Sequence, residues 1–72
     1  MRSVIQETVT AHEWALQMHG FYTDAEEKTI RFDVVLSFNV ERKEALEILH
    51  GEIQALYPDY QIQIVPDIDV SD

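Results

Sequence analysis

One stretch of sequence, IRFDVVLSFNV at positions 30–40, decides the predicted fold. Large apolar side chains occupy every second position, and the positions between them are mostly polar. The apolar set comprises Ile30, Phe32, Val34, Leu36, Phe38 and Val40. Because successive side chains of a strand point to opposite faces, this alternation predicts a β-strand with one face in the core.

The residues before this stretch predict a partner strand. From Glu13 the period is two, with Trp14, Leu16 and Met18 on one face and Gln17 and His19 on the other. The first set is predicted to face the core. Residues 23–28, TDAEEK, are polar and predict a hairpin loop between the two strands.

The residues after the stretch predict a helix from about residue 40 to residue 57. Asn39 can cap its first turn, and Pro58 stops it. The expected buried stripe consists of Leu46, Leu49, Ile53 and Leu56, flanked by Ala45 and Ile48. A third strand then alternates Tyr60, Ile62 and Ile64 with Gln61, Gln63 and Val65, and Pro66 ends it.

The amino-terminal residues 3–11 predict a short helix, because Ser3 and Gln6 form a capping-box pattern before apolar residues at helical spacing. The element order is therefore α-β-β-α-β. It predicts a single α+β domain over residues 1–72, a two-layer sandwich with two helices on one face of a three-stranded sheet. This is a ferredoxin-like arrangement short of one strand.

Composition excludes several classes of function. Five basic against 14 acidic residues give a net charge of −9, which repels nucleic acid and anionic lipid and attracts cations. Cysteine is absent, so disulfides and thiolate sites are excluded. Apolar runs such as Val34-Val35-Leu36 are far too short to insert into a membrane. No Gly-rich phosphate loop, His-Glu-x-x-His motif or Ser beside a His is present, so we expect no enzyme activity.

Strand parity predicts what lies on the sheet face without helices. That face should carry Ala15, Gln17, His19, Arg31, Asp33, Val35, Ser37, Gln61, Gln63, Val65 and Asp67. Its mixture of polar and apolar groups suits either a wet protein–protein contact or a bare solvated surface.

His19 and Asp33 are the candidate ligands on this face. With the hairpin loop centred near Ala25, Asp33 pairs opposite Gln17, and His19 is its diagonal neighbour. An imidazole beside a carboxylate in an acidic protein is either the start of a metal site or a solvated surface pair. His12 and His50 have no matching partner in the sequence and are expected to be structural or surface residues.

Four segments in order resemble one family: residues 18–22 (MHGFY), 30–35 (IRFDVV), 57–60 (YPDY) and 64–67 (IVPD). They resemble the cytoplasmic carboxy-terminal domain of cation diffusion facilitator transporters, the cation-efflux proteins. The resemblance implies a metallochaperone-like fold, a homodimer, and attachment to a transmembrane domain at the cytoplasmic face of the cell membrane. It also implies export of a divalent metal in exchange for protons.

The resemblance implies metal ligands at His19, Asp33 and Asp67. His19 stands where family members carry a histidine, and Asp33 stands where they carry a second one. A family His-x-Asp-Pro run reads Val65-Pro66-Asp67-Ile68 here, so Val65 replaces the third histidine. One imidazole and two carboxylates are a harder ligand set, which makes manganese, iron(II) or cobalt alternatives to zinc. If the third strand is parallel to the second, Asp67 lies far from His19 and would need a bend at Pro66 or a dimer axis to join it.

The function expected from the sequence is a dimerising, metal-sensing cytoplasmic domain of a divalent cation/proton antiporter. Two alternatives stay open. One is a metal-free structural dimerisation module of the same transporter type, and the other is a free-standing ferredoxin-like sensor of a small ligand.

Overall fold

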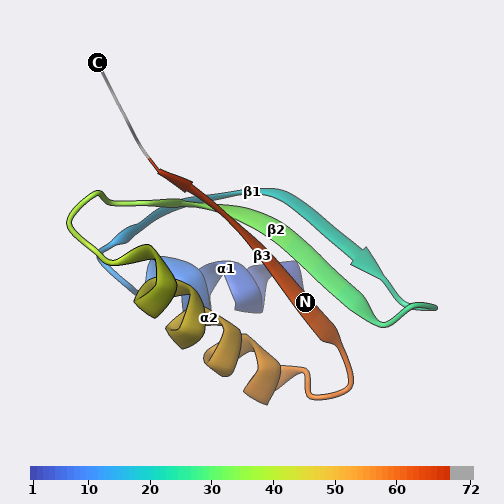
Figure 1. Cartoon of the computed structure of the whole chain (residues 1–72). Coiled ribbons are helices and arrows are strands. Elements are labelled where there is room, and N and C mark those ends of the chain that lie inside the picture. Colours follow the sequence, from blue (N-terminus) through green and yellow to red (C-terminus); the bar gives the residue numbers. More distant parts are fainter. Residues whose placement is uncertain (69–72) are drawn as a thin grey trace.

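Five elements follow the predicted order in the computed structural model of the chain, which describes residues 1–68. They are α1 (Arg2–Thr10), β1 (Ala15–Asp24), β2 (Thr29–Leu36), α2 (Arg42–Leu56) and β3 (Gln61–Ile68). Both helices lie against the same side of the sheet, as Figure 1 shows. The predicted two-layer α+β sandwich is confirmed.

The sheet has the order β1-β2-β3, so β2 is central and the other two strands are edges. β1 and β2 form an antiparallel hairpin, and β3 runs parallel to β2 after the crossover through α2. On the covered face α1 packs beneath β1, α2 packs beneath β3, and the two helices contact each other. Each helix therefore covers one half of the sheet.

The core is built on the alternation of β2. Ile30, Phe32, Val34 and Leu36 are all at most 1% exposed, which confirms their predicted facing. They pack against buried residues of the helices and of the other strands: Ile5, Val9, Ala15, Ala45, Leu49, Ile53 and Ile62. The Phe21 ring stacks on Phe32 with 6.4 Å between the ring centroids.

β2 ends at Leu36, earlier than predicted. Phe38 lies in the following turn and is 86% exposed, so its predicted place in the core is wrong. The backbone N–H of Ser37 donates to the carbonyl of Trp14 at 2.8 Å, just beyond the last strand pair. The chain then turns toward α2, so the apolar residue at position 38 no longer follows the strand period.

The beginnings of both helices also differ from the predictions. α2 begins at Arg42, with Glu41 at the N-cap and no side-chain capping bond, so Asn39 is not its cap. α1 begins at Arg2 with Met1 at its N-cap, so the Ser3–Gln6 capping box is wrong. Neither helix in residues 1–68 is long and apolar enough to cross a membrane.

Within α2 the buried stripe is narrower than predicted. Ala45, Leu49 and Ile53 are fully buried, whereas Leu56 is 46% exposed. Leu56 is the last helical residue and lies beyond the part of the sheet that α2 covers.

At the start of β1 the side chains face the opposite way from the prediction. Ala15 is 5% exposed and Leu16 is 44% exposed, so the predicted facing of these two residues is wrong. A register irregularity between Ala15 and Gln17 causes this, and a second one follows between His19 and Tyr22. An extra residue on one strand flips the side-chain alternation beyond it.

β3 continues through Pro66 to Ile68, although the sequence predicted an end at Pro66. Gln61 N–H donates to the carbonyl of Lys28 at 2.7 Å, so the odd-numbered residues of β3 direct their backbone groups toward β2. Pro66 is an even-numbered residue of β3, so its nitrogen faces the outer edge of the sheet. A proline there removes no bond between the strands.

Candidate metal centre

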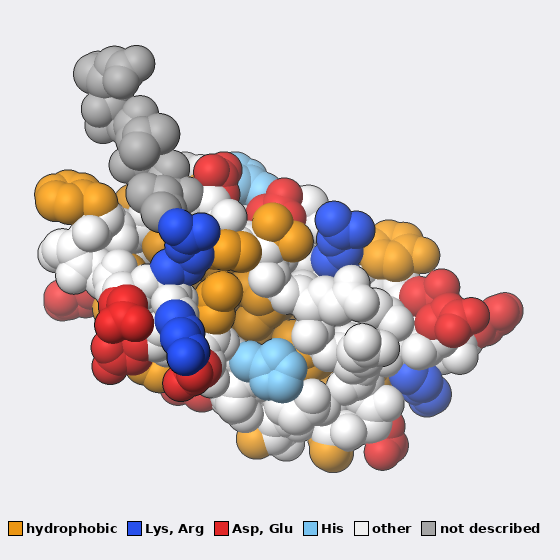
Figure 2. Space-filling view, viewed as in Figure 1, with side chains coloured by type: hydrophobic (Ala, Val, Ile, Leu, Met, Phe, Trp, Pro, Cys, Tyr) orange, Lys and Arg blue, Asp and Glu red, His pale blue; other side chains and the backbone are white. Residues whose placement is uncertain are grey.

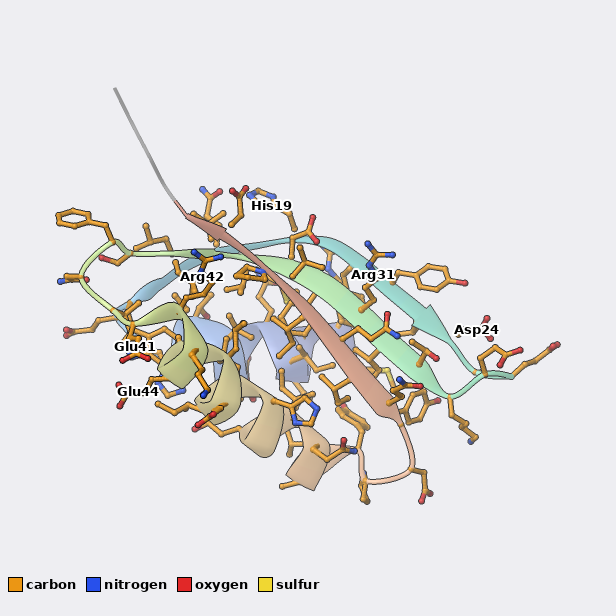
Figure 3. The ribbon with its side chains drawn as sticks, in the orientation of Figure 1. His19, Asp24, Arg31, Glu41, Arg42 and Glu44 are labelled. Carbon is orange, nitrogen blue, oxygen red and sulfur yellow. The ribbon has the colours of Figure 1, made fainter. Side chains whose placement is uncertain are left out.

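The sheet face opposite the helices carries the predicted ligands. On β2 the residues between the buried ones are Arg31, Asp33 and Val35, and all three are at least partly exposed. Residues paired directly with them lie on the same face. Figure 3 shows His19 and Arg31 on this side of the ribbon, away from both helices.

His19 and Asp33 pair directly across the β1–β2 ladder. The predicted pairing had made them diagonal neighbours, and the irregular register of β1 brings them one step closer. Asp33 also pairs with Val65 on its other side. His19, Asp33 and Val65 thus form one row across the three strands, and Asp33 is the central residue.

The His19 side chain is oriented by Gln17. Its Nε2 lies 2.8 Å from Gln17 Oε1. An amide oxygen only accepts, so the imidazole donates through Nε2–H, and the neutral ring then carries its lone pair on Nδ1. That is the protonation form in which a histidine binds a metal through Nδ1.

Gly20 makes room for the Asp33 carboxylate. A Cβ on Gly20 would lie 3.4 Å from Asp33 Oδ2, and the residue has a φ of +60°. Glycine adopts this left-handed conformation without the strain that a side chain would introduce. The backbone conformation of β1 at its second irregularity therefore favours glycine, and the Asp33 carboxylate lies beside it.

Asp67 belongs to a different row. It pairs with Val35, which pairs in turn with Gln17 on β1. Two strand spacings and two residue steps separate it from His19, a distance of about 12 Å between backbone positions. The structure brings together His19 and Asp33 and leaves Asp67 apart from them.

Within residues 1–68, no group of three or more His, Cys, Asp or Glu side chains is arranged to hold a metal ion. Asp69, a further carboxylate two positions after Asp67, lies outside the described residues. Of the candidate ligands, His19 and Asp33 are the two that lie side by side on one face of the sheet.

His12 makes a structural contact that the sequence did not reveal. Its Nε2 donates to Glu52 Oε1 at 2.8 Å, and its ring stacks on Trp14 with 4.4 Å between centroids. These contacts connect the segment before β1 to α2. The partners His12 and Glu52 are 40 positions apart, so no local spacing pattern could have indicated them.

Comparisons of this chain with protein-family models, with curated proteins and with solved structures found no match. The resemblance to the cation diffusion facilitator domain therefore stays a prediction from the sequence.

Proposed function

We propose that this chain is the dimerising, metal-responsive cytoplasmic domain of a divalent-cation exporter that exchanges its metal for protons. The observation that carries the proposal is the His19–Asp33 pair on the helix-free sheet face. The row containing this pair also includes Val65, so the three positions at which the resemblance implies histidines are adjacent in space. The α-β-β-α-β order is the one that the resemblance implies.

The ligand count favours a metal shared between two copies. Zinc in proteins is usually four-coordinate, and its ligands include imidazole nitrogen and carboxylate oxygen. One chain supplies two such ligands, so two chains related by a two-fold axis supply four. Mn²⁺, Fe²⁺ or Co²⁺ also accepts this combination of ligands, since carboxylates suit harder cations.

Charge explains how metal would control assembly. Two chains of net charge −9 repel each other. A divalent cation at the contact neutralises part of that charge, and binding to the dimer alone stabilises it by mass action. The concentration of free metal would then set the fraction of dimer, which is how such a domain would report metal to the membrane part of a transporter.

A second candidate is dimerisation through the same face without metal. Val35 of the central strand is half-buried and Val65 of the edge strand β3 is 39% exposed, and both lie on this face. Apolar groups at these positions favour direct contact between two copies. A metal-free dimer should strengthen as salt rises, because screening weakens the repulsion between like charges.

Calorimetric titration with zinc and with manganese, combined with sedimentation equilibrium, tests the proposal on the 72-residue chain. We expect one metal ion per two chains and a metal-dependent dimer. His19→Ala should remove most of the binding, whereas His50→Ala, which removes an exposed histidine of α2, should not. A chain that stays monomeric at high micromolar concentration with either metal would overturn the proposal. A dimer that forms equally without metal would favour the second candidate.

A further inference from the structure

A groove of about 670 Å³ runs between α2 and the edge strand β3. Its lining includes Lys43, Leu46 and Gly51 from the helix and Ile62, Ile64 and Val65 from the strand. Figure 2 shows hydrophobic side chains exposed between these two elements, bordered by basic and histidine side chains. The groove follows the outer edge of β3 and reaches Val65, which belongs to the His19–Asp33–Val65 row on the other face of the sheet.

The strand along this groove has backbone groups that β2 does not use. The hydrogen bond from Gln61 N–H to the carbonyl of Lys28 shows that the odd-numbered residues of β3 bond to β2. Ile62 and Ile64 therefore direct both their N–H and their C=O away from β2, toward the outer edge. Such a row of groups is a template for another extended chain.

The two edges of the sheet differ in how well they could accept a strand. β1 is interrupted by two register irregularities, a common protection of sheet edges. β3 pairs with β2 in unbroken register over all eight of its residues. Pro66 removes one outward donor, but Ile62 and Ile64 precede it. The regular edge is thus the edge that has the apolar groove beside it.

Hydrogen bonds fix the turn that connects the two walls of the groove. Gln54 Nε2 donates to the carbonyls of Tyr57 at 3.1 Å and Tyr60 at 2.7 Å, which fixes the turn between α2 and β3. Gly51 contributes no side chain, and a Cβ built on it meets no atom within 4 Å. A site that is already formed loses less conformational entropy when it binds a partner.

We propose that this groove binds an extended, positively charged peptide segment, which adds to β3 as a fourth strand and places alternate apolar side chains against Leu46 and Ile64. The eight residue steps from Lys43 to Gly51 correspond to about 12 Å of helix. About four extended residues cover that length. Backbone pairing and alternate side-chain pockets together are the chemistry of strand addition.

The net charge of the chain indicates what kind of peptide the groove would bind. With 14 acidic and five basic residues, the protein attracts a basic segment and repels a second copy of itself. Glu47 in the groove provides a carboxylate for such a segment, but Lys43 in the same lining is basic. The attraction therefore comes from the net charge of the whole chain and not from the groove alone. Two copies joined through the β3 edge would repel each other, and no metal ion would lie at that contact to offset the repulsion. Copies joined through the His19–Asp33 face would have such an ion under the proposed function.

Amide hydrogen exchange followed by NMR tests the pairing, with a capped Lys-Val-Lys-Val-Lys-Val-Lys peptide as the probe. We expect the Ile62 and Ile64 amides to exchange at least tenfold more slowly with peptide. The Gln63 and Val65 amides, already bonded to β2, should change little. A peptide of the same composition with its lysines and valines in separate blocks should give no such protection. Equal protection by both peptides would overturn the proposal.

N-methylation of the probe separates strand pairing from charge attraction. One peptide is methylated at its valine nitrogens and another at its lysine nitrogens. One of the two should lose binding at least tenfold: the valine set if the peptide is antiparallel to β3, and the lysine set if it is parallel. Retained binding by both would contradict strand addition.

Gly51→Leu fills the groove in a helix that tolerates leucine well. We expect it to weaken peptide binding at least tenfold, whereas Ala55→Leu, at an exposed position of α2 outside the groove lining, should not. Loss of binding in both variants, or in neither, would overturn the assignment of the groove. Protection of Ile62 and Ile64 that rises with protein concentration without peptide would instead assign the edge to a second copy.

Discussion

The central strand β2 and the edge strand β1 are neighbours in one hairpin, yet they differ in how regularly buried and exposed side chains alternate along them. In β2 every second residue from Ile30 to Leu36 is buried without interruption. In β1 the alternation is broken twice, and a leucine at position 16 is exposed while the alanine before it is buried. A strand held on both sides cannot accommodate an extra residue as an edge strand can.

The proposed metal site lies where the less regular strand pairs with the regular one. The break between His19 and Tyr22 contains Gly20, beside which the carboxylate of Asp33 lies. β2 supplies regularly spaced backbone positions, and the irregular register of β1 pairs His19 with Asp33. The following substitutions test how far the two strands differ.

Phe32→Ala should have the largest effect, a loss of about 3–5 kcal/mol in the free energy of unfolding. Phe32 is fully buried in the middle of β2 and contacts the Phe21 ring. Urea denaturation measures the loss. Glu26→Ala, in the exposed hairpin turn, is the control and should stay within about 0.5 kcal/mol. Equal shifts of the two midpoints would mean that β2 is not the centre of the core.

Gly20→Ala should destabilise the chain by about 1–2 kcal/mol, because a left-handed backbone conformation strains a residue with a Cβ. Gly51→Ala provides a matched control of opposite sign. Gly51 lies inside α2 with open space around it, so alanine should stabilise the chain by about 0.5–1 kcal/mol. Thermal melts measure both changes, and a Gly20→Ala variant that melts at or above the temperature of the parent chain would show that β1 does not need its irregularity.

Leu16→Ala should cost about 1 kcal/mol or less, since almost half of this side chain is already exposed. A leucine that faced the core, as the sequence predicted for Leu16, would cost about 2–5 kcal/mol. Equilibrium unfolding in urea distinguishes the two values. A loss in the higher range would restore the simple alternation of β1.

His19→Ala should change stability least, within about 0.5 kcal/mol, because the residue is an exposed surface side chain. Its effect should appear in metal binding, where most of the affinity is lost. In the parent chain, lowering the pH should also weaken binding, since protons compete with the metal for the imidazole. Calorimetry at two pH values checks this, and metal affinity independent of pH would argue against an imidazole ligand.

The element order and the face of β2 could be predicted because they depend on local patterns. Alternation predicted which residues of β2 are buried, and apolar spacing predicted Leu49 and Ile53 in α2. The phase of β1 could not be predicted, because an extra residue at position 16 or 20 changes which side chains pair without changing the local composition. Pro66 was misjudged for a similar reason, since its tolerance depends on which edge of β3 its nitrogen faces.

The candidate site was predicted in part. Parity alone placed His19 and Asp33 on one face, and the observed register made them direct rather than diagonal neighbours. The distance from His19 to Asp67 depended on strand direction, which the β2–α2–β3 crossover determines. The α2–β3 groove had no signature in the sequence, because it is formed by residues far apart in the chain and by the missing side chain of Gly51.

The turn between β1 and β2 bears on the order in which the sheet assembles. Asp24 Oδ1 accepts hydrogen bonds from the backbone N–H groups of Glu26 and Glu27. These bonds stabilise the short turn at residues 25–28. Pairing of β3 with β2 instead joins residues about 30 positions apart, and its loop-closure entropy is correspondingly larger. The hairpin should therefore form before β3 docks. We expect Asp24→Ala to slow folding and Ile62→Val mainly to speed unfolding, a difference that stopped-flow kinetics would reveal.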